Sequence, residues 1–457
     1  MYRMNLQQYI KEYHEGRADW FLEEVQSVSA QQRVMNVLNL KEYLDGKHKI
    51  LQKPNEKFGG KEYVPRKIVL NHALTLLNFQ TSFLLQNPVT ITGKERIVKE
   101  YQKVNKQGKY DRLNYRILDK MLKYGQVFEY VYLDKNTIKS KLIDASEAYP
   151  IHNHENEMIA FVQAYMVDGI DYYIVYSEDT VETYDNKGGQ LRMTGRYANL
   201  SGLPIVYKTT NEINENEGKS ELENWISILD SLEDLISKAT DAYYKFITGI
   251  PVVTGQQLKG EGLPVDVVGA GLNLDDGATF EFVSNKFDSN AFDTLYETLL
   301  NALYTVAHLP AIAVGRTDIS NVSTEAVKML YQLAMMKAGQ NEQYMREGIE
   351  QRFEKIRRML KYKGVTFTDD EFDSLGLVFS YQLPSNDKEV IENMKMLREM
   401  KGLSIETMLE HNPYVNDVQQ ELMRLKEEND TTYSSGVNTK TQDVVFNENA
   451  DVSRENT

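Results

Sequence analysis

The clearest pattern in this chain is a helical spacing of apolar residues within residues 219–248. Six apolar side chains share one face of a helix there: Leu222, Trp225, Ile226, Leu229, Leu232 and Ile236. Gly218 precedes the pattern, and Ser220 and Glu223 have the spacing of a capping box, in which each side chain bonds the other residue's backbone amide. The sequence therefore predicts a long amphipathic helix that begins at this box.

A second helix is predicted over residues 289–309, after an insert of different character. Its apolar positions follow the helical period and end at Leu309-Pro310: Phe292, Leu295, Leu299, Leu303 and Val306. Between the two helices, residues 249–288 contain glycines and two β-rich runs, 251–254 and 279–283. The sequence thus predicts two helices joined by a small β-rich module.

A third and longer helix is predicted over residues 324–363. Ser323 is a suitable N-cap and Gly364 a stop signal, and we expect bends at Gly339 and Gly348 because glycine weakens a helix interior. A strand over 377–381 and shorter helices over 387–400, 404–410 and 415–428 follow. Residues 431–457 are polar and aperiodic, so we expect disorder there.

The N-terminal region, residues 1–218, combines helices with a β-rich stretch. A helix over 66–85 is expected to end before Pro88, because the residue before proline avoids the helical conformation. Between 127 and 206, aromatic and β-branched runs are separated by turn signals at Asp168-Gly169 and Gly188-Gly189, which predicts antiparallel meanders. The predicted fold class is therefore α+β, mostly helical.

Composition narrows the classes of function. The 457 residues carry a net charge of −15 and contain no cysteine, which excludes disulfides and thiolate metal sites. No apolar run approaches the roughly 18 residues that a membrane span needs, so we expect a protein that folds in the cytoplasm without a membrane partner. Because Lys and Arg supply most non-specific affinity for nucleic acid, the negative charge fits passage of DNA along acidic walls better than its capture.

Candidate sites for chemistry are weak. Gly218-Lys219-Ser220 resembles the end of a phosphate-binding loop, but Ile213 occupies the position of its first glycine, and a capped helix is the preferred interpretation. The best metal candidate is the group His152, His154 and Glu155, for which an exposed turn is the alternative interpretation. No arrangement of residues indicates a nucleophile with its base.

Seven cations gather in the second half of the third helix: Arg346, Arg352, Lys355, Arg357, Arg358, Lys361 and Lys363. Two interpretations are open. The cations either face nucleic acid, or they are solvated side chains that the helix dipole favours near a C-terminus. We prefer the second interpretation.

Several segments, each weak alone, form a more specific set through their order and spacing. They are Asn71, 82–89 (SFLLQNPV), 124–134 (YGQVFEYVYLD), 203–206 (LPIV), 218–223 (GKSELE) with Leu229-Asp230, and 323–326 (STEA). Over most of residues 40–430 the chain therefore resembles the portal proteins of tailed bacteriophages, particularly those of long-tailed phages that infect Gram-positive bacteria. It departs from their pattern at Gln86, where glycine is common, and at Glu221, where aspartate is usual.

The resemblance implies a portal fold with wing, stem, clip and crown regions that assembles as a ring of twelve subunits. The implied regions are a wing (1–218), two stem helices (219–248 and 289–309), a clip (249–288), a tunnel loop (310–323), a long helix with a wing strand (324–384), a crown (385–430) and a disordered tail (431–457). The stem would start at Gly218, Ser220 and Glu223.

The resemblance also implies the residues that meet DNA and other proteins. The channel residues of the tunnel loop would be Arg316, Thr317, Asp318, Ile319, Ser320, Asn321 and Val322. The clip residues that meet the packaging motor and the adaptor proteins would be Gln256, Lys259, Glu261, Asp266, Asp275 and Asp276.

The resulting hypothesis is a non-enzymatic portal subunit of the virion, made in the host cytoplasm. Its ring at one capsid vertex would serve DNA packaging, retention, ejection and head-tail joining. Its partners would be copies of itself, double-stranded DNA, the terminase large subunit, head-completion (adaptor) proteins, and capsid and scaffolding proteins, with no cofactor and no metal. Two alternatives remain open: a metal-dependent hydrolase that uses His152, His154 and Glu155, and another minor head structural protein without a central bore.

Overall fold

The structure is a computed structural model that describes most of the chain. The described residues are 4–58, 61–247, 250–255, 276–283, 288–310, 328–381, 387–410, 412, 414–415, 418 and 420–426. The chain divides into two compact units. One comprises Met1–Asn321 and Lys328–Gln382, and the other comprises Val322–Val327 and Leu383–Thr457.

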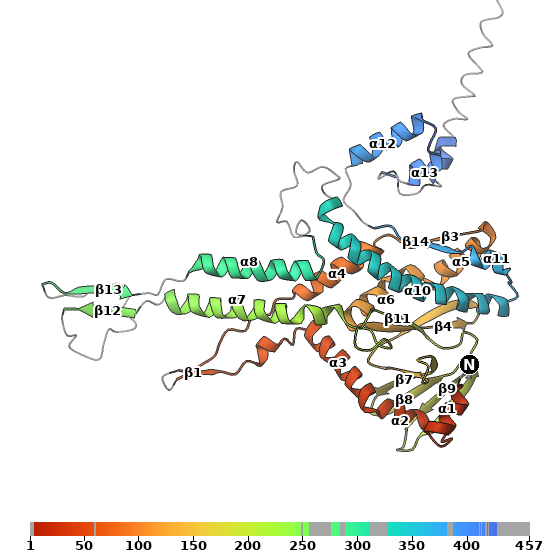
Figure 1. Ribbon diagram of the computed structural model, residues 1–457, viewed down its shortest axis with the longest axis horizontal. Coiled ribbons are helices and arrows are strands. Elements are labelled where there is room, and N and C mark those ends of the chain that lie inside the picture. Colours follow the sequence, from red (N-terminus) through yellow and green to blue (C-terminus); the bar gives the residue numbers. More distant parts are fainter. Residues whose placement is uncertain are drawn as a thin grey trace, which may run out of the picture. The chain divides into compact units, whose positions relative to one another are not determined.

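The first unit begins with helices that pack against a five-stranded sheet (Figure 1). The helices are α1 (Leu6–Tyr13), α2 (Trp20–Gln26) and α3 (Val28–Leu44), and the sheet has the order β10-β9-β8-β7-β6. Its strands are β6 (Ala148–His152), β7 (Met158–Val167), β8 (Ile170–Tyr176), β9 (Thr180–Asp185) and β10 (Arg192–Ala198). Trp20 and Phe21 of α2 are buried together with Tyr149, Val162 and Tyr184 of the sheet, so aromatic burial holds the helices on this face.

The predicted antiparallel meander is confirmed in this sheet. Strands β6 to β10 pair in chain order, each antiparallel to the next. Asp168-Gly169 joins β7 to β8, and Gly188-Gly189 lies between β9 and β10. All four residues have positive φ, between 51° and 82°. Glycine adopts this conformation without strain, which is why these dipeptides were useful turn signals.

A three-stranded sheet of order β11-β4-β5 shares a core with the first sheet. Its strands are β4 (Gln126–Asp134), β5 (Thr137–Ile143) and β11 (Ile205–Lys208). Phe128 and Ile143 of this sheet are buried with Phe161 and Tyr176 of the meander. Helices α5 (Glu95–Gly108) and α6 (Tyr110–Tyr124) contact β5 and β4 respectively. The region is α+β, as predicted.

Two further helices, α4 (His72–Leu85) and α10 (Gln332–Tyr362), pack against each other and against α6. The prediction that α4 begins at residue 66 is wrong, because residues 66–70 are extended and bond another helix through their backbone amides. Helix α10 covers most of the predicted long helix and is about 46 Å long at 1.5 Å per residue. It continues through Gly339 and Gly348 without interruption.

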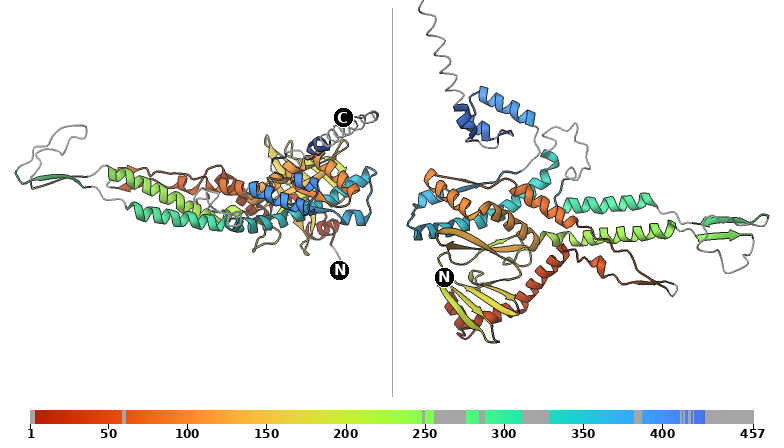
Figure 2. Two further views of the ribbon diagram at one scale, coloured as in Figure 1. Left: turned by 90° about the horizontal axis from the view of Figure 1, so that it is seen from above. Right: turned by 180° about the vertical axis from the view of Figure 1, so that it is seen from behind.

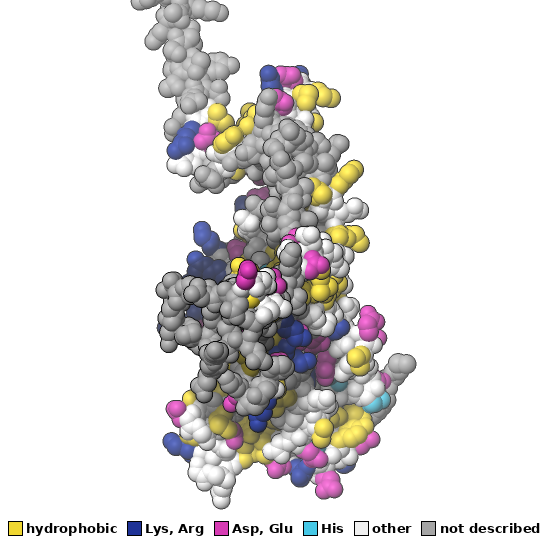
Figure 3. Space-filling view, turned by 90° about the vertical axis from the view of Figure 1, so that its left-hand side faces the viewer, with side chains coloured by type: hydrophobic (Ala, Val, Ile, Leu, Met, Phe, Trp, Pro, Cys, Tyr) yellow, Lys and Arg dark blue, Asp and Glu magenta, His cyan; other side chains and the backbone are white. Residues whose placement is uncertain are grey.

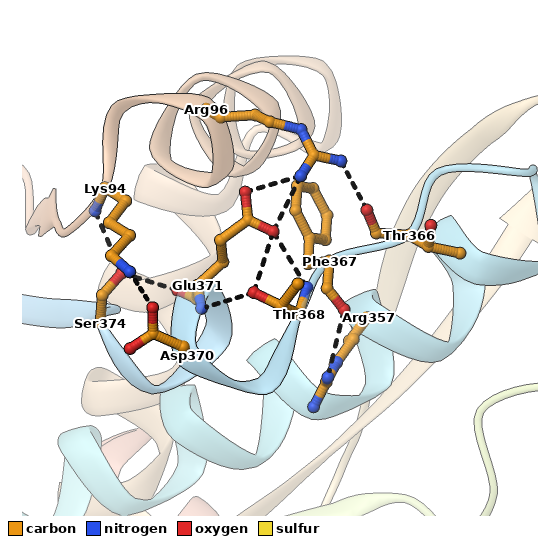
Figure 4. A network of polar contacts seen from close by, with 9 residues as sticks. All are labelled: Lys94, Arg96, Arg357, Thr366, Phe367, Thr368, Asp370, Glu371 and Ser374. Carbon is orange, nitrogen blue, oxygen red and sulfur yellow. Dashed lines mark hydrogen bonds and ion pairs between the residues drawn. The ribbon is translucent and has the colours of Figure 1, made fainter.

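A short two-stranded sheet pairs a strand that follows α10 in the chain with a strand that precedes α5. Strand β14 (Gly376–Val378) pairs with β3 (Thr90–Thr92), so the predicted strand over 377–381 is shorter and starts one residue earlier. Helix α11 (Asp369–Asp373) lies just before it, and Figure 4 shows how polar contacts hold this helix. Arg96 donates to Glu371 at 2.6 and 2.8 Å and to the Thr366 carbonyl at 2.6 Å, and Arg357 donates to Asp369 at 2.5 Å.

Helices α7 (Ile226–Ile247) and α8 (Ser289–Val306) lie side by side and run in opposite directions (Figures 1 and 2). In the chain, a hairpin of β12 (Ile250–Thr254) and β13 (Thr279–Val283) is inserted between them. The two predicted helices are therefore confirmed, and the two β-rich runs in the described part of the insert form strands. Near α7 lie the 3-10 turns η1 (Lys49–Gln52) and η2 (Glu221–Asn224), and the chain also forms the hairpin β1 (Glu56–Phe58) and β2 (Lys61–Tyr63).

The second unit contains α12 (Asp387–Glu399) and α13 (Ile405–Glu410), which confirm the predicted helices over 387–400 and 404–410. The expected disordered tail, 431–457, lies outside the described residues. Across the described ranges, no helix has both the length and the apolar character that crossing a bilayer would require.

Candidate functional site

The candidate site is the antiparallel pair α7–α8 and the contacts that hold it on the rest of the first unit. Two glycines permit the chain before η2 to cross the end of α6 at close range. A Cβ on Gly218 would lie 1.9 Å from the Gly125 carbonyl oxygen, and a Cβ on Gly125 would lie 2.4 Å from the Gly218 carbonyl oxygen. Both distances are far below any real contact. The segments 124–134 and 218–223, distant in sequence, therefore meet at a point where only glycine fits.

Thr209, the residue after β11, fastens this crossing. Its Oγ1 donates to the Lys219 carbonyl at 2.6 Å and accepts from the Lys219 amide at 3.0 Å, while its own amide donates to the Gly125 carbonyl at 3.0 Å. Backbone groups that have no partner in a strand or helix are thus satisfied at the crossing. The crossing therefore attaches the segment that precedes α7 to β11 and to the end of α6.

The predicted capping box at Ser220 and Glu223 is only half confirmed, because Ser220 is the N-cap of the first turn but Glu223 does not bond back to it. Residues 221–224 form the 3-10 turn η2, and α7 begins only at Ile226. Ser220 Oγ donates to the Lys123 carbonyl at 2.6 Å and accepts from the Leu222 amide at 3.1 Å, while Glu223 accepts from Asn36 Nδ2 at 2.8 Å. Because both side chains bond other elements, they tie η2 to α6 and α3 instead of capping each other.

A buried ion pair joins the same turn to α10. Lys337 donates to Glu221, and the two side chains are only 8% and 9% exposed. Removing one partner of such a pair would leave the other charge buried without compensation, which costs about 3–5 kcal/mol. The pair therefore fixes where α10 meets the start of α7.

Three polar side chains of α7 hold an extended segment, residues 66–70, which we call the strap. Asp241 accepts from the Arg66 amide at 3.0 Å, Ser237 Oγ from the Ile68 amide at 3.0 Å, and Glu233 from the Leu70 amide at 2.8 Å. Four residues of helix rise about 6 Å and two residues of strand about 6.6 Å, so the two spacings match. The side chains of α7 thus take the place of a neighbouring strand.

A buried histidine contacts Glu233, the residue of α7 that accepts from the Leu70 amide of the strap. His48 Nδ1 lies 2.5 Å from Glu233 Oε1, with side chains 2% and 0% exposed, and its ring stacks on Tyr43 with ring centroids 3.9 Å apart. Lys53 pairs with Asp234 one residue further along α7. The segments before and after the β1–β2 hairpin are therefore both tied to α7.

One face of α8 is polar and lacks cations; we call it the α8 stripe. Its exposed side chains are Asn290, Asp293, Thr294, Glu297, Thr298, Asn301 and Thr305, and no Lys or Arg occurs in Ser289–Val306. The hydroxyls of Thr294, Thr298 and Thr305 donate to the carbonyl four residues before each. The face therefore offers oxygen atoms and two carboxylates, but no group that binds phosphate tightly.

Six of the seven cations of that cluster contact other residues of the first unit, so neither interpretation holds for the cluster as a whole. Lys361 is exposed in the last turn of α10, as the helix-dipole interpretation expects. Arg352 is buried. It donates to both Glu129 oxygens at 2.9 Å, to the Tyr207 hydroxyl at 2.8 Å and to Asn114 at 2.7 Å. Lys355 donates to the carbonyls of Ser201 and Leu203, and burial lowers its pKa to about 8.

Three further cations of that cluster also have partners within the chain. Arg346 pairs with Glu342 at 2.6 Å, Arg358 pairs with Glu178 at 2.6 Å, and Lys363 donates to the Asn136 carbonyl at 2.6 Å. Figure 3 shows another side of the molecule, on which Lys and Arg side chains are likewise interspersed with Asp and Glu side chains. The second half of α10 is thus a structural element of the first unit.

The metal candidate is a turn between two strands. His152 ends β6, and His154 and Glu155 follow in the turn before β7. The Asn153 side chain organises this turn, because its Oδ1 accepts from the amides of Glu155 and Glu157 at 2.9 and 3.0 Å. Among the residues that the structure describes, no three His, Cys, Asp or Glu side chains are placed to hold a metal ion. The structure therefore does not bring His152, His154 and Glu155 together as a set of metal ligands.

Most of the implied contact residues lie outside the described part of the chain. This applies to the whole tunnel loop 316–322 and to Gln256, Lys259, Glu261, Asp266 and Asp275. Asp276 is described, and it is exposed in the turn before β13. Of the implied contact and stem-start residues, the structure brings Gly218, Ser220 and Glu223 together at the base of α7.

Sequence reasoning missed the buried polar partners. Glu129 is a lone carboxylate in the apolar run of β4, and Glu233, Ser237 and Asp241 recur every four residues along α7. A carboxylate at a position whose neighbours are all apolar signals a buried cation or amide partner, because an unpaired buried charge is too costly. The sequence contains this signal, but it does not show which cation or amide is the partner of each buried carboxylate.

Comparisons with known proteins identify the family of this chain. A family model described as "Phage portal protein, SPP1 Gp6-like" matches residues 29–434. The portal protein of Bacillus phage SPP1 is 20% identical over 387 residues, which cover 76% of this chain and 73% of that protein.

Two solved structures, both of gene transfer agent (GTA) particles, show weaker likeness. The neck of an empty GTA particle, computed with C6 symmetry, matches with 8% identity and a TM-score of 0.44, over 77% of this chain and 88% of that one. The neck of a native GTA particle, computed with C12 symmetry, matches with 10% identity and a TM-score of 0.42, over 73% and 87%.

The helix pair with its inserted hairpin, carried on an α+β body, is the arrangement expected of a portal protein. The family match spans nearly the whole described chain, and this chain belongs to the phage portal proteins of the SPP1 Gp6-like family.

Proposed function

We propose that this portal protein forms a closed homo-oligomeric ring, of twelve subunits, and that α7 and α8 form the wall of its DNA channel. The α8 stripe is the observation that carries this proposal. A wall past which DNA slides must avoid tight phosphate contacts, and the exposed polar face of α8 has hydroxyls, amides and carboxylates but no cation. The net charge of −15 also disfavours tight binding of DNA phosphates.

The proposed regions follow the bounds that the sequence suggests. Residues 219–248 and 289–309 are the stem, 249–288 the clip, 310–323 the tunnel loop, 385–430 the crown, and 1–218 with 324–384 the wing. The base of the stem is supported by the glycine crossing at Gly125 and Gly218, by the Lys337–Glu221 pair and by the strap. These contacts would keep the stem in place while DNA moves through the ring.

The proposed partners belong to the same assembly. The clip, which includes the β12–β13 hairpin, would meet the terminase large subunit during packaging and the adaptor proteins afterwards. Capsid and scaffolding proteins would surround the wing while the particle assembles in the host cytoplasm. The subunit itself would hydrolyse no nucleotide, because the motor supplies that chemistry.

Adding positive charge to the α8 stripe tests the proposed channel wall. Thr298→Lys should leave ring formation unchanged but lower the amount of DNA packaged or slow its ejection, because each subunit would then offer the duplex a phosphate contact. The measurement is packaged and ejected DNA per particle.

Two control variants make this test specific. Thr298→Gln places a long neutral side chain at the same position, and Gln343→Lys adds the same charge at an exposed position of α10. The proposal predicts that both behave as the unmodified protein. Equal behaviour of Thr298→Lys and Thr298→Gln in rings of normal size would show that α8 does not face the DNA.

A further inference from the structure

A small cavity with both polar and apolar lining residues lies between α4, the end of α8 and α10. The residues that line it include Gln80 and Phe83 of α4, His308 just after α8, and Asn341 of α10, and its volume is about 10 Å³. Helix α8 ends beside it, where the Leu309 amide donates to the Tyr304 carbonyl at 2.9 Å and His308 adopts a positive φ of 56°. The cavity therefore sits where one helix of the stem pair stops.

Four buried polar atoms on the lining residues have no hydrogen-bond partner among the described residues. They are Gln80 Oε1, His308 Nδ1, and both Nδ2 and Oδ1 of Asn341. Gln80 is 5% exposed and Asn341 only 1%. The other end of the Gln80 amide is fixed, because its Nε2 donates to the Ala307 carbonyl at 2.9 Å. Leaving such atoms unsatisfied is costly, so a bonding partner is expected.

The size and chemistry of the cavity select a water molecule as that partner. A buried water needs about 10–15 Å³ of such volume and two to four polar neighbours, and both conditions are met here. Water both donates and accepts, as the mixed set of amide donor and acceptor atoms requires. A metal cation would satisfy only the acceptors, and the Lys337 side chain, which also lines the cavity, would repel it.

We propose that this cavity binds one internal water molecule that bridges Gln80 of α4, His308 after α8 and Asn341 of α10. The water joins three helices at the point where α8 ends. It makes a fixed joint between α8 and the body of the first unit. The proposal concerns residues within one subunit and stands independently of the proposed channel.

Replacing Asn341 by a residue of similar size without polar atoms tests the bridge. If water is bound, Asn341→Leu removes its partner on α10 and displaces it, and Gln80 Oε1 and His308 Nδ1 lose their bonds. The melting temperature of the assembled protein should then fall by about 2 °C or more relative to Gln343→Leu, an exposed substitution on the same helix. In a dry cavity the leucine would fill space and remove an unsatisfied amide, so a higher melting temperature than that of Gln343→Leu would overturn the proposal.

A high-resolution structure of the unmodified, assembled protein tests the proposal even if Asn341→Leu fails to fold. The expected result is a density peak within about 2.7–3.2 Å of at least two of the atoms Gln80 Oε1, His308 Nδ1 and Asn341 Oδ1 or Nδ2. A cavity without a peak, or one closed by direct bonds between these side chains, would contradict it.

Discussion

The fully buried Arg352 links three secondary-structure elements through one side chain. Its guanidinium bonds Glu129 of β4, the Tyr207 hydroxyl of β11 and Asn114 of α6. A guanidinium has five donors in a fixed fork, and a single carboxylate beside it both balances the charge and fixes its orientation. The same pattern recurs at Lys337 and Glu221. Buried pairs of this kind decide how α10 is seated on the body.

Gly348 shows how closely α10 approaches β11. A Cβ there would lie 2.1 Å from the Tyr207 ring, whose hydroxyl is held by Glu129 and Arg352. We predict that Gly348→Ala lowers the free energy of unfolding by about 1–3 kcal/mol, since the ring cannot move without breaking those bonds. Urea denaturation of the purified protein measures this.

Gly339 on the same helix is the matched control. A Cβ there would lie 3.7 Å from the Tyr381 hydroxyl, an ordinary contact. Gly339→Ala should therefore raise the free energy of unfolding by about 0.5–1 kcal/mol, because alanine suits a helix interior better than glycine. Similar effects of the two substitutions would contradict the packing described for Gly348.

Lys355 should give the protein a specific pH dependence. Burial lowers the pKa of its ammonium group to about 8, below the value of about 10.4 in an unfolded chain. Below pH 8 the folded state carries the full cost of the buried charge, and that cost disappears as the pH rises from about 8 to about 10.4. We predict that the unmodified protein gains stability relative to Lys355→Met across this window, as measured by urea denaturation at pH 7 and pH 10. A difference that stays constant with pH would show that the folded pKa is not lowered.

At the scale of elements, the strap explains why one predicted helix starts late. Three backbone amides of residues 66–70 donate hydrogen bonds to the side chains of Asp241, Ser237 and Glu233. The chain therefore stays extended until Asn71, and α4 begins at His72. Local preference could not reveal this, because the competing acceptors lie on a helix far along the sequence. The late start of α7 has the same cause, since Ser220 and Glu223 bond α6 and α3 instead of each other.

The strap can be tested by removing its central acceptor. Ser237→Ala should speed hydrogen exchange of the backbone amides in residues 66–70, most of all at Ile68, because that amide donates to Ser237 Oγ. Ser231→Ala is the control, since the Ser231 hydroxyl donates only to the Ser227 carbonyl of its own helix in the contacts seen here. Unchanged exchange in residues 66–70 for Ser237→Ala would contradict the assigned role of the strap.

Other elements could be predicted well because their signals are local. The apolar period of α7, α8 and α10 extends over several turns, and the glycine turns at 169 and 188–189 fix the ends of strands in the meander. The candidate site was only partly accessible in this way. Gly218 was noticed as a helix start, but its real constraint is contact with Gly125, and contacts between distant glycines leave no periodic trace.

At the scale of the whole molecule, membership of the portal family connects these details. Three of the segments that suggested the family meet in space, since 124–134 and 203–206 pair as β4 and β11 and 218–223 crosses beside them. The residues implied to touch DNA or the motor were assigned through the resemblance alone, and they remain proposals.

Direct imaging of the purified protein by electron cryomicroscopy tests the central claim most directly. The account predicts closed rings with an open central channel, and a reconstruction in which the Thr294, Thr298 and Asn301 side of α8 faces that channel. Monomers under conditions that support assembly, or rings in which α8 is turned away from the axis or the centre is filled by protein, would contradict it.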